Sequence, residues 1–305
     1  MRNEPHVSGL KVVLAFAAIY LVWGSTYLAI LLAIKSIPPF FMIGARFLIA
    51  GMLLLIWCIA VKHPMPSASL VLKNSLAGVL MLCFGTGAVA WVEQYLSSGL
   101  TAIIVAMAPI WFVLLDKRKW QYHLKNKKII FGLLVGLGGV VLLFSDSATF
   151  NLQGNRMQFM SIFVMVFGSI MWVTGSLYSK YKASEGAAPV NTAIQMLGAG
   201  AALLLIAFAF GEHHILNLQK ITWESAAALL YQIVFGSLLA YMAYVWLLTV
   251  RTPSLVGTYA LVNPAVAVFL GWLIADEKIL FNQVIALMII LSGVVLVTFT
   301  KRQQV

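Results

Sequence analysis

The stretch that decides the fold is residues 10–34, LKVVLAFAAIYLVWGSTYLAILLAI, in which Lys11 is the one charged residue. A helix needs about 20 mostly apolar residues to cross the roughly 30 Å hydrocarbon core of a membrane. This stretch therefore predicts a membrane-spanning helix. Comparable stretches recur along the chain, and we expect ten spanning helices at residues 10–34, 38–61, 72–92, 97–115, 129–146, 157–179, 189–211, 224–248, 253–275 and 280–300.

The composition agrees with a chain that lies almost entirely within the bilayer. Of its 305 residues, 62% are hydrophobic and 10% are charged, whereas soluble domains carry about 45–50% and about 25%. So few charges exclude a water-soluble domain. Cys58 and Cys83 both lie in apolar runs, so we expect neither a disulfide framework nor a metal site. The predicted fold class is an all-α integral membrane protein.

The net charge of +11 has to be interpreted by position against the bilayer, and we expect no nucleic-acid partner. If the N-terminus is cytoplasmic, Lys35, Arg156, Lys220 and Lys278 fall outside and Arg46 falls within a helix. The other bases then lie on the cytoplasmic side, as the positive-inside rule requires. They are Arg2, Lys11, Lys62, Lys73, Lys117, Arg118, Lys119, Lys125, Lys127, Lys128, Lys180, Lys182, Arg251, Lys301 and Arg302. We expect a multi-pass protein of the inner membrane with both termini in the cytoplasm.

The two halves of the chain resemble each other at a nearly constant offset. Gly24-Ser25-Thr26-Tyr27 matches Gly175-Ser176-Leu177-Tyr178, and Pro38 matches Pro189, both 151 residues later. Similar matches follow at offsets of 154 and 155, and they pair Trp91 with Trp246, Pro109 with Pro264, and residues 139–142 with residues 293–296. These matches predict two repeats, at residues 1–146 and 147–305.

The number of helices in each repeat determines how the repeats are oriented. Five is odd, so the second repeat starts on the opposite side of the membrane and the two repeats are inverted. Inverted repeats are common in secondary transporters, where the substrate site lies between the halves near the midplane. The alternative is a duplication kept for packing alone, as in a receptor or an assembly subunit.

Several motifs together resemble the drug/metabolite transporter superfamily, EamA type. They are Trp23-Gly-Ser-Thr-Tyr27, Arg46-Phe-Leu-Ile-Ala50, Glu93-Gln94 followed by residues 98–102 and Pro109, and Asn263-Pro264 followed by Gly293-Val294. The resemblance covers about residues 10 to 300. It implies a transporter that exports or facilitates the passage of small metabolites, often amino acids, by alternating access through a cavity between the repeats.

Two charged residues are the sharpest candidates for transport chemistry. Arg46 lies about 12 Å inside its helix, at 1.5 Å per residue. A guanidinium at that depth can bind a substrate carboxylate, although it can also pair with protein groups. Glu93, beside Gln94 at the outer end of the third helix, is a candidate gate or proton carrier. It can equally pair with Arg46 or lie in a solvated turn.

Aromatic side chains and prolines complete the predicted site. Trp23 and Tyr27 lie near mid-span on one helix, where the interfacial role common for aromatic residues is disfavoured. Pro109 and Pro264 interrupt the fourth and ninth helices at matched positions, as hinges or as static kinks. The remaining expected cavity residues are Trp91, Trp172, Tyr178, Tyr244, Tyr259 and Asn263.

The resulting hypothesis is a transporter of small organic molecules, with possible proton coupling and no cofactor. No G-x-x-x-x-G-K-[ST] loop is present, so we do not expect this chain to use ATP. An intramembrane enzyme is the least favoured alternative, because no acid, base and nucleophile cluster is apparent at membrane depth. A non-transporting receptor or assembly subunit is the other alternative.

Overall fold

A computed structural model describes residues 8–96, 98–143, 156–266 and 281–298, which form helices joined by loops and contain no strand. The helices are α1 (Gly9–Ala33), α2 (Pro39–Ala60), α3 (Ala68–Gly78), η1 (Val79–Thr86), α4 (Gly87–Val92), α5 (Ser98–Val105), α6 (Ala108–Leu115), η2 (Lys117–Lys119), α7 (Trp120–Lys125), α8 (Lys127–Leu143), α9 (Arg156–Lys182), α10 (Ala188–Ala209), α11 (Glu212–Ile215), η4 (Leu218–Lys220), α12 (Trp223–Tyr231), η5 (Gln232–Tyr241), α13 (Met242–Val250), α14 (Pro253–Val256) and α16 (Phe281–Thr298). Residues 259–266 are also helical.

The all-α membrane fold predicted from the sequence is confirmed. Each of the ten predicted spans contains helix. Within the described residues, six helical segments are long and apolar enough to cross a membrane: Gly9–Ala33, Pro39–Ala60, Ala68–Val92, Arg156–Lys182, Ala188–Ala209 and Trp223–Val250. The predicted repeat boundary at residues 146 and 147, and part of the ninth and tenth spans, lie outside the described residues.

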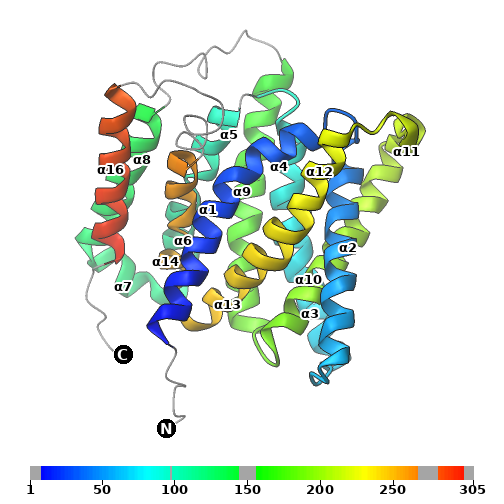
Figure 1. Ribbon diagram of the computed structural model, residues 1–305. Helices are drawn as coiled ribbons and strands as arrows, with labels where there is room; N and C mark the ends of the chain where they lie inside the picture. Colours follow the sequence, from blue (N-terminus) through cyan, green and yellow to red (C-terminus); the bar gives the residue numbers. More distant parts are fainter. Residues whose placement is uncertain (1–7, 97, 144–155, 267–280, 299–305) are drawn as a thin grey trace.

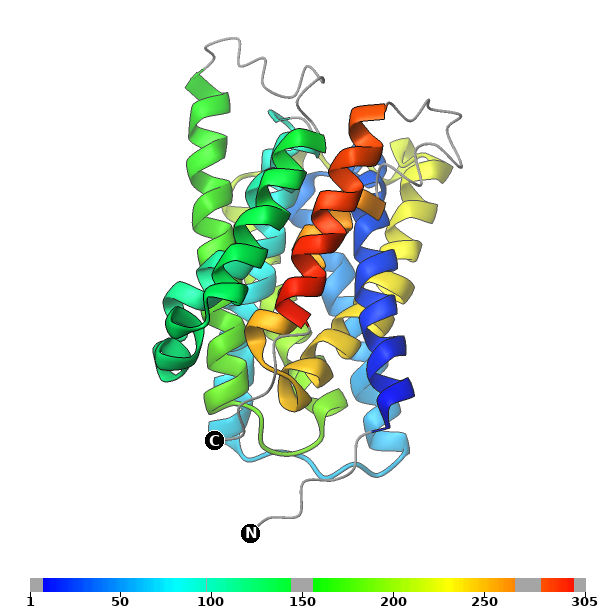
Figure 2. The same cartoon turned by 90° about the vertical axis from the view of Figure 1, so that its left-hand side faces the viewer.

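The helices run roughly side by side and define two ends of a bundle (Figure 1). At one end, called the basal face here, α1 begins, α2 ends and α9 ends. At the opposite, apical face, α1 ends, α2 begins and α12 begins. Figure 2 shows α8 and α16 lying against each other along one flank. The other long helices, α1, α2, α9 and α10, pack with the segments Ala68–Val92 and Trp223–Val250 to form the rest of the bundle.

Glycines allow two helix pairs to approach closely. A Cβ atom at Gly293 of α16 would lie 2.6 Å from the Gly132 carbonyl oxygen of α8, and one at Gly139 would lie 2.9 Å from the Ile290 nitrogen. Between α2 and α10, a Cβ atom at Gly200 would lie 2.8 Å from the Leu48 nitrogen. Such small residues bring membrane helices into backbone contact, where van der Waals packing holds them together.

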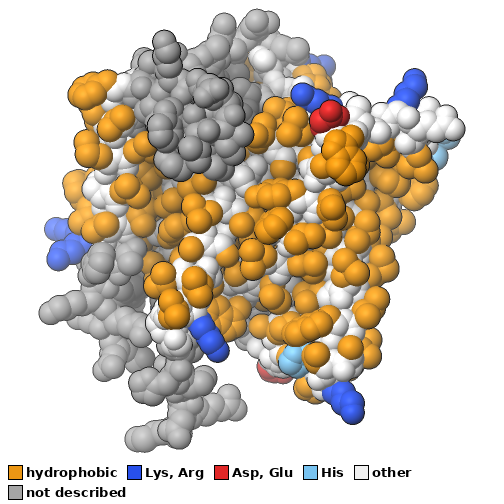
Figure 3. Space-filling model, viewed as in Figure 1, with side chains coloured by type: hydrophobic (Ala, Val, Ile, Leu, Met, Phe, Trp, Pro, Cys, Tyr) orange, Lys and Arg blue, Asp and Glu red, His pale blue; other side chains and the backbone are white. Residues whose placement is uncertain are grey.

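The outer surface shown in Figure 3 is mainly apolar along the sides of the bundle. Most basic side chains visible in this view lie near the top and the bottom, and a further group lies on the left flank. A membrane surrounds a helix with hydrocarbon, so apolar residues on this surface are in their preferred solvent. The exposed large side chains include Leu14, Leu21, Leu28, Ile56, Phe163 and Leu205.

Two of the spanning segments change their winding near the middle. Within Ala68–Val92, η1 is π-helical, and within Trp223–Val250, η5 is π-helical. A π-helix closes its hydrogen bonds five residues apart and occurs mostly as a short insertion, often at a functional site. The two π segments overlap when the chain is shifted by the 155-residue offset of the predicted repeat.

The acidic side chain of Glu212 caps a helix from across the apical face. Its Oε2 accepts the backbone N–H of Phe41 at 2.7 Å, and its Oε1 accepts that of Phe40 at 3.2 Å. The N-cap residue of α2 is Pro38, which supplies no side-chain cap of its own. A helix N-terminus leaves backbone N–H groups unpaired and favours a negative charge, so Glu212 supplies from α11 what α2 lacks.

Replacing Glu212 by alanine is therefore expected to destabilise the bundle by about 1 kcal/mol, the usual cost of losing a helix cap. Thermal unfolding of the purified protein in detergent measures this as a lower Tm. The exposed Glu185 provides the control, because Glu185→Ala removes an acid that caps no helix start. An unchanged Tm for Glu212→Ala would contradict the capping role.

Candidate functional site

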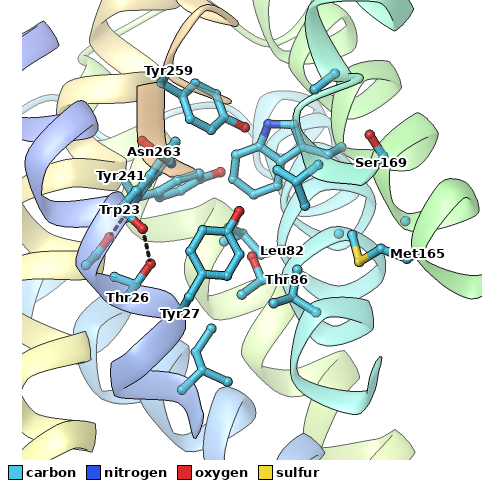
Figure 4. A pocket seen from close by; sticks show the side chains of 18 of the residues that line it. Trp23, Thr26, Tyr27, Leu82, Thr86, Met165, Ser169, Tyr241, Tyr259 and Asn263 are labelled. Carbon is cyan, nitrogen blue, oxygen red and sulfur yellow. Dashed lines mark hydrogen bonds between the residues drawn. The ribbon is translucent and has the colours of Figure 1, made fainter. Parts of the chain in front are cut away.

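A cavity of about 90 Å³ lies in the middle and apical half of the bundle. Helices from both halves of the chain contribute its walls. Figure 4 shows Tyr27 and Tyr259 extending into the same space, with Met165 and Ser169 on the far wall. The lining residues are Trp23, Thr26, Tyr27, Ile30, Arg46, Phe47, Leu82, Gly85, Thr86, Val89, Val105, Ala108, Met165, Gly168, Ser169, Trp172, Gly236, Tyr241, Tyr259 and Asn263.

Arg46 is the charged side chain among these lining residues. It is 4% exposed, and its Nε donates to the Ser237 hydroxyl of η5 at 2.9 Å. The guanidinium carbon also lies 4.8 Å from the centre of the Phe47 ring. Gly236 makes room for it, since a Cβ atom there would lie 2.7 Å from Nη2. Within the described residues, no acidic side chain pairs with Arg46, so its charge is available to a ligand.

Trp23 is the centre of an aromatic cluster that forms the basal wall of the cavity. Its ring lies 5.5 Å from that of Trp172, 5.1 Å from that of Tyr244 and 4.8 Å from that of Tyr259. The Trp23 Nε1 donates to the Gly236 carbonyl at 3.1 Å. Aromatic contacts of this kind add to the stability gained by burial. The rings are consequently fixed in place before any ligand binds.

Further hydrogen bonds hold this wall in place. The Trp172 Nε1 donates to the Tyr244 hydroxyl at 3.1 Å, and Ser176 lies 2.7 Å from the same hydroxyl. The Asn263 amide nitrogen is placed to donate to the backbone carbonyls of Tyr20 at 3.2 Å and Tyr259 at 2.9 Å. Tyr244 and Asn263 thus support the cavity wall through bonds to other protein groups.

Glu93 lies just beyond the end of α4, outside the spanning segment Ala68–Val92. Its side chain is 6% exposed, and neither carboxylate oxygen has a hydrogen-bond partner within the described residues. Burial raises the pKa of Glu93 well above its usual value, because a charge is costly away from water. The hydroxyl of Tyr27, which lines the cavity, is a titratable group that interacts electrostatically with Glu93. The pairing of Glu93 with Arg46 that we considered from the sequence is absent from the structure.

The structure brings together some of the predicted site residues and separates others. Six of them line the cavity: Trp23, Tyr27, Arg46, Trp172, Tyr259 and Asn263. Tyr244 lies directly behind the lining, against Trp23. The other predicted residues are not among the lining residues: Trp91, Tyr178, Glu93, Gln94, Pro109 and Pro264. Trp91 packs on Tyr95, with ring centres 5.0 Å apart, and the exposed Gln94 donates to the Trp91 carbonyl.

The helix breaks do not coincide with the two prolines. The fourth span is interrupted between α5 and α6, and Pro109 lies in the first turn of α6. The ninth span turns at residues 257–258, and Pro264 lies inside the helical stretch 259–266. A proline is tolerated in a first turn because that turn's N–H groups have no helical partner, which explains why the break precedes Pro109.

Ser169 is a lining residue that the sequence analysis did not single out. It is 4% exposed, and its hydroxyl has no hydrogen-bond partner within the described residues. Other hydroxyls of α9 donate to the carbonyl four residues earlier, as Ser161 does to Met157 and Thr174 to Ile170. Since serine in a helix commonly makes this bond, the sequence gives no signal that Ser169 differs.

A buried network of side chains, named the basal network here, lies on the basal side of the cavity and includes the lining residue Tyr241. The Gln195 amide nitrogen donates to Asn74 at 2.8 Å and Ser179 at 3.1 Å. Its oxygen accepts the hydroxyl of Tyr241, a lining residue, at 2.7 Å. Asn74 also donates to Asn191 at 3.1 Å. The network therefore joins α3, α9, α10 and η5 below the cavity.

The residues that follow Ser179 fasten the basal face further. The Lys180 Nζ donates to the carbonyls of Leu248 and Arg251, at the end of α13. The Tyr181 hydroxyl donates to Asp116 at 2.9 Å. The end of α9 is thus bonded to three other parts of the bundle.

An all-helical membrane bundle with a cavity lined from both halves of the chain is an arrangement common in membrane transport proteins. Residues 10–145 and 159–299 match the EamA-like transporter family, and the chain belongs to this family. It is 36% identical over 292 residues to the uncharacterized inner membrane transporter YedA of Escherichia coli strain K12, covering 94% of this chain and 90% of that protein.

A more distant relative and a solved structure also match this chain over nearly their whole length. The chain is 24% identical over 296 residues to the uncharacterized transporter YoaV of Bacillus subtilis strain 168, covering 95% of this chain and 98% of that one. A solved crystal structure superimposes with a TM-score of 0.77 at 16% identity, covering 96% of this chain and 99% of that chain. That likeness supports the fold. The family membership predicted from the sequence motifs is confirmed.

Proposed function

We propose that this chain is a secondary transporter of the inner membrane that exports small organic metabolites carrying a carboxylate, such as amino acids or related compounds. The observation that carries this proposal is Arg46, a buried guanidinium that lines a central cavity and has no acidic partner among the residues that the structure describes. A buried charge is stable only when it is paired and hydrogen-bonded. The Ser237 hydroxyl satisfies one N–H group, and a ligand carboxylate would supply the missing charge.

The family and its named relatives support transport as the activity, and the YedA name supports an inner membrane. The positive-inside pattern supports a cytoplasmic basal face, because Lys62, Lys117 and Lys182 lie at that end of the bundle. Export as the direction of flow is part of the proposal, because the resemblance to this family implies export or facilitated passage of small metabolites.

Alternating access follows from the position of the cavity relative to the basal network. If the basal network blocks passage below Tyr241, a substrate in the cavity would leave toward the apical side. Entry from the basal side would require the contacts of Asn74, Gln195 and Tyr241 to open. In transporters with inverted repeats, such opening is largely a rocking of one part of the bundle against the other.

The experiment that tests the proposal is counterflow in proteoliposomes, using labelled amino acids and small carboxylic acids. Vesicles preloaded with the unlabelled compound are expected to accumulate the labelled form transiently. The compound with the strongest response serves as the reference substrate below. No counterflow for any carboxylate, with the protein folded in the membrane, would contradict the proposal.

Proton coupling through Glu93 is a part of the proposal that can be tested separately. Because burial raises its pKa, Glu93 is expected to hold a proton near neutral pH and to lose it when water reaches it. An imposed pH gradient is then expected to accelerate flux of the reference substrate severalfold. Glu93→Gln is expected to remove this response while counterflow without a gradient continues.

Gln94→Ala is the matched control, because Gln94 is exposed and adjacent in sequence. It should retain the full response to the gradient. A wild-type protein that ignores the gradient, or a Glu93→Gln variant that still responds to it, would exclude Glu93 as the proton carrier.

A further inference from the structure

The geometry points to a narrower substrate class: monoanionic organic acids with an apolar or aromatic body and no ammonium group. This inference rests on the proposed function and deepens it, since it separates simple carboxylic acids from zwitterionic amino acids.

Among the residues that the structure describes, the lining carries one charge, the guanidinium of Arg46, and no acidic side chain. The candidate for a negative counter-charge is Glu93. It is not among the lining residues, but it interacts electrostatically with the lining residue Tyr27. Its two oxygens are buried without partners in the described part of the chain. An ionised carboxylate in that setting is unfavourable, so Glu93 is expected to be neutral. The net charge at the cavity is then +1.

A bound monoanion would neutralise this charge, with its carboxylate beside Arg46. A zwitterion would leave the charge at +1 and bring an ammonium group close to a guanidinium of the same sign. The described part of the lining provides no carboxylate for that ammonium. Buried charges without counter-charges are disfavoured, because the surrounding protein and lipid replace water poorly.

The walls suit an apolar or aromatic body. Trp23, Trp172 and Tyr259 contribute aromatic rings that pack on one another, and Leu82 and Met165 contribute apolar side chains. Ring faces can also attract an ammonium group, but this attraction is weaker than a paired opposite charge. The same walls therefore do not offset the missing carboxylate.

Three compounds with the same phenyl body separate the alternatives. They are 3-phenylpropanoate, which has only the carboxylate, L-phenylalanine, which has both charged groups, and 2-phenylethylamine, which has only the ammonium. Binding to the purified protein in lipid nanodiscs can be followed by the fluorescence of the lining tryptophans Trp23 and Trp172. A Trp23→Phe variant shows how much of the signal arises in the cavity.

The expected result is that 3-phenylpropanoate binds at least tenfold more tightly than L-phenylalanine, and that 2-phenylethylamine binds most weakly. Arg46→Gln should remove the advantage of the carboxylate, while Lys11→Gln, which removes an exposed charge at the start of α1, should preserve it. Size-exclusion chromatography establishes that Arg46→Gln is folded. If it is not, Arg46→Lys replaces it and should weaken the preference.

Equal or tighter binding of L-phenylalanine would overturn this inference while leaving transport of amino acids intact. Tightest binding by the amine, or binding of none of the three at millimolar concentration, would overturn it as well. The two proposals fail separately. Selective binding of the acid without counterflow would contradict the transport function, whereas counterflow of L-phenylalanine in preference to the acid would contradict only the charge selection.

Discussion

Replacing Arg46 by glutamine is expected to lower counterflow of the reference substrate by about 10- to 100-fold at unchanged protein abundance. Hydrogen bonds to charged groups contribute about 1.5–3 kcal/mol, and each 1.4 kcal/mol corresponds to a tenfold change in affinity. Glutamine keeps a polar, shorter side chain but removes the charge and the paired N–H groups that a carboxylate prefers.

Two further variants separate the contribution of the Arg46 charge from those of its guanidinium geometry and its bond to Ser237. Arg46→Lys keeps the charge and loses the planar, forked geometry, so an intermediate flux is expected. Ser237→Ala removes the acceptor of the Arg46 Nε and leaves the charge in the cavity. Its effect should be smaller than that of Arg46→Gln.

The competing explanation is that Arg46 stabilises the bundle through Ser237 and Phe47. Thermal unfolding of each variant in detergent separates this from a binding role. A loss of flux that follows the loss of folded protein, or a folded Arg46→Gln variant with normal counterflow, would show that Arg46 does not bind substrate.

The second large effect is expected at the basal network. Gln195→Leu removes the bonds to Asn74, Ser179 and Tyr241 together and leaves their polar groups buried beside an apolar side chain. A buried polar group without a partner costs about 1–3 kcal/mol. Opening the basal face would let water reach these groups, so the variant should favour the basally open state by roughly 10- to 100-fold.

Labelling of a single cysteine measures this shift. Cys58 and Cys83, both buried, are replaced by alanine, and Thr86→Cys places a thiol in the cavity. A membrane-impermeant maleimide is then applied to one face of oriented vesicles at a time. With Gln195 present, the thiol should react from the apical face, and with Gln195→Leu it should also react from the basal face.

Gln232→Leu is the matched control, because Gln232 is equally buried and lies in the apical half, where its amide donates to the Thr26 carbonyl. It should not increase labelling from the basal face. Unchanged basal labelling in a folded Gln195→Leu protein would show that the basal network is not the barrier.

The class of fold could be predicted from the sequence, because a helix that crosses the hydrocarbon core must be long and apolar, as residues 10–34 are. It also pointed to Arg46, since a charge at membrane depth is uncommon and needs a reason. Trp23 and Tyr27 were accessible to the same reasoning, because α1 is one regular α-helix and its faces follow from the spacing.

Trp91 illustrates why other positions could not be assigned from spacing. It follows the π-helical segment η1, in which more residues are used for each turn, so a face extrapolated at 3.6 residues per turn drifts. Tyr244 follows η5 in the same way and lies behind the lining rather than in it. The basal network was also missed, because asparagine, glutamine and serine residues on three helices and a tyrosine on a fourth give no signal until the helices are packed.

The central claim is that Arg46 holds a substrate carboxylate in a cavity through which that substrate crosses the membrane. The most direct measurement is counterflow of labelled small carboxylic acids into proteoliposomes that contain either the wild-type protein or Arg46→Gln, with matched amounts of folded protein. The account predicts transient accumulation of at least one acid with the wild-type protein and a loss of at least tenfold with the variant. Equal accumulation with both proteins, or none with the wild-type protein, would contradict it.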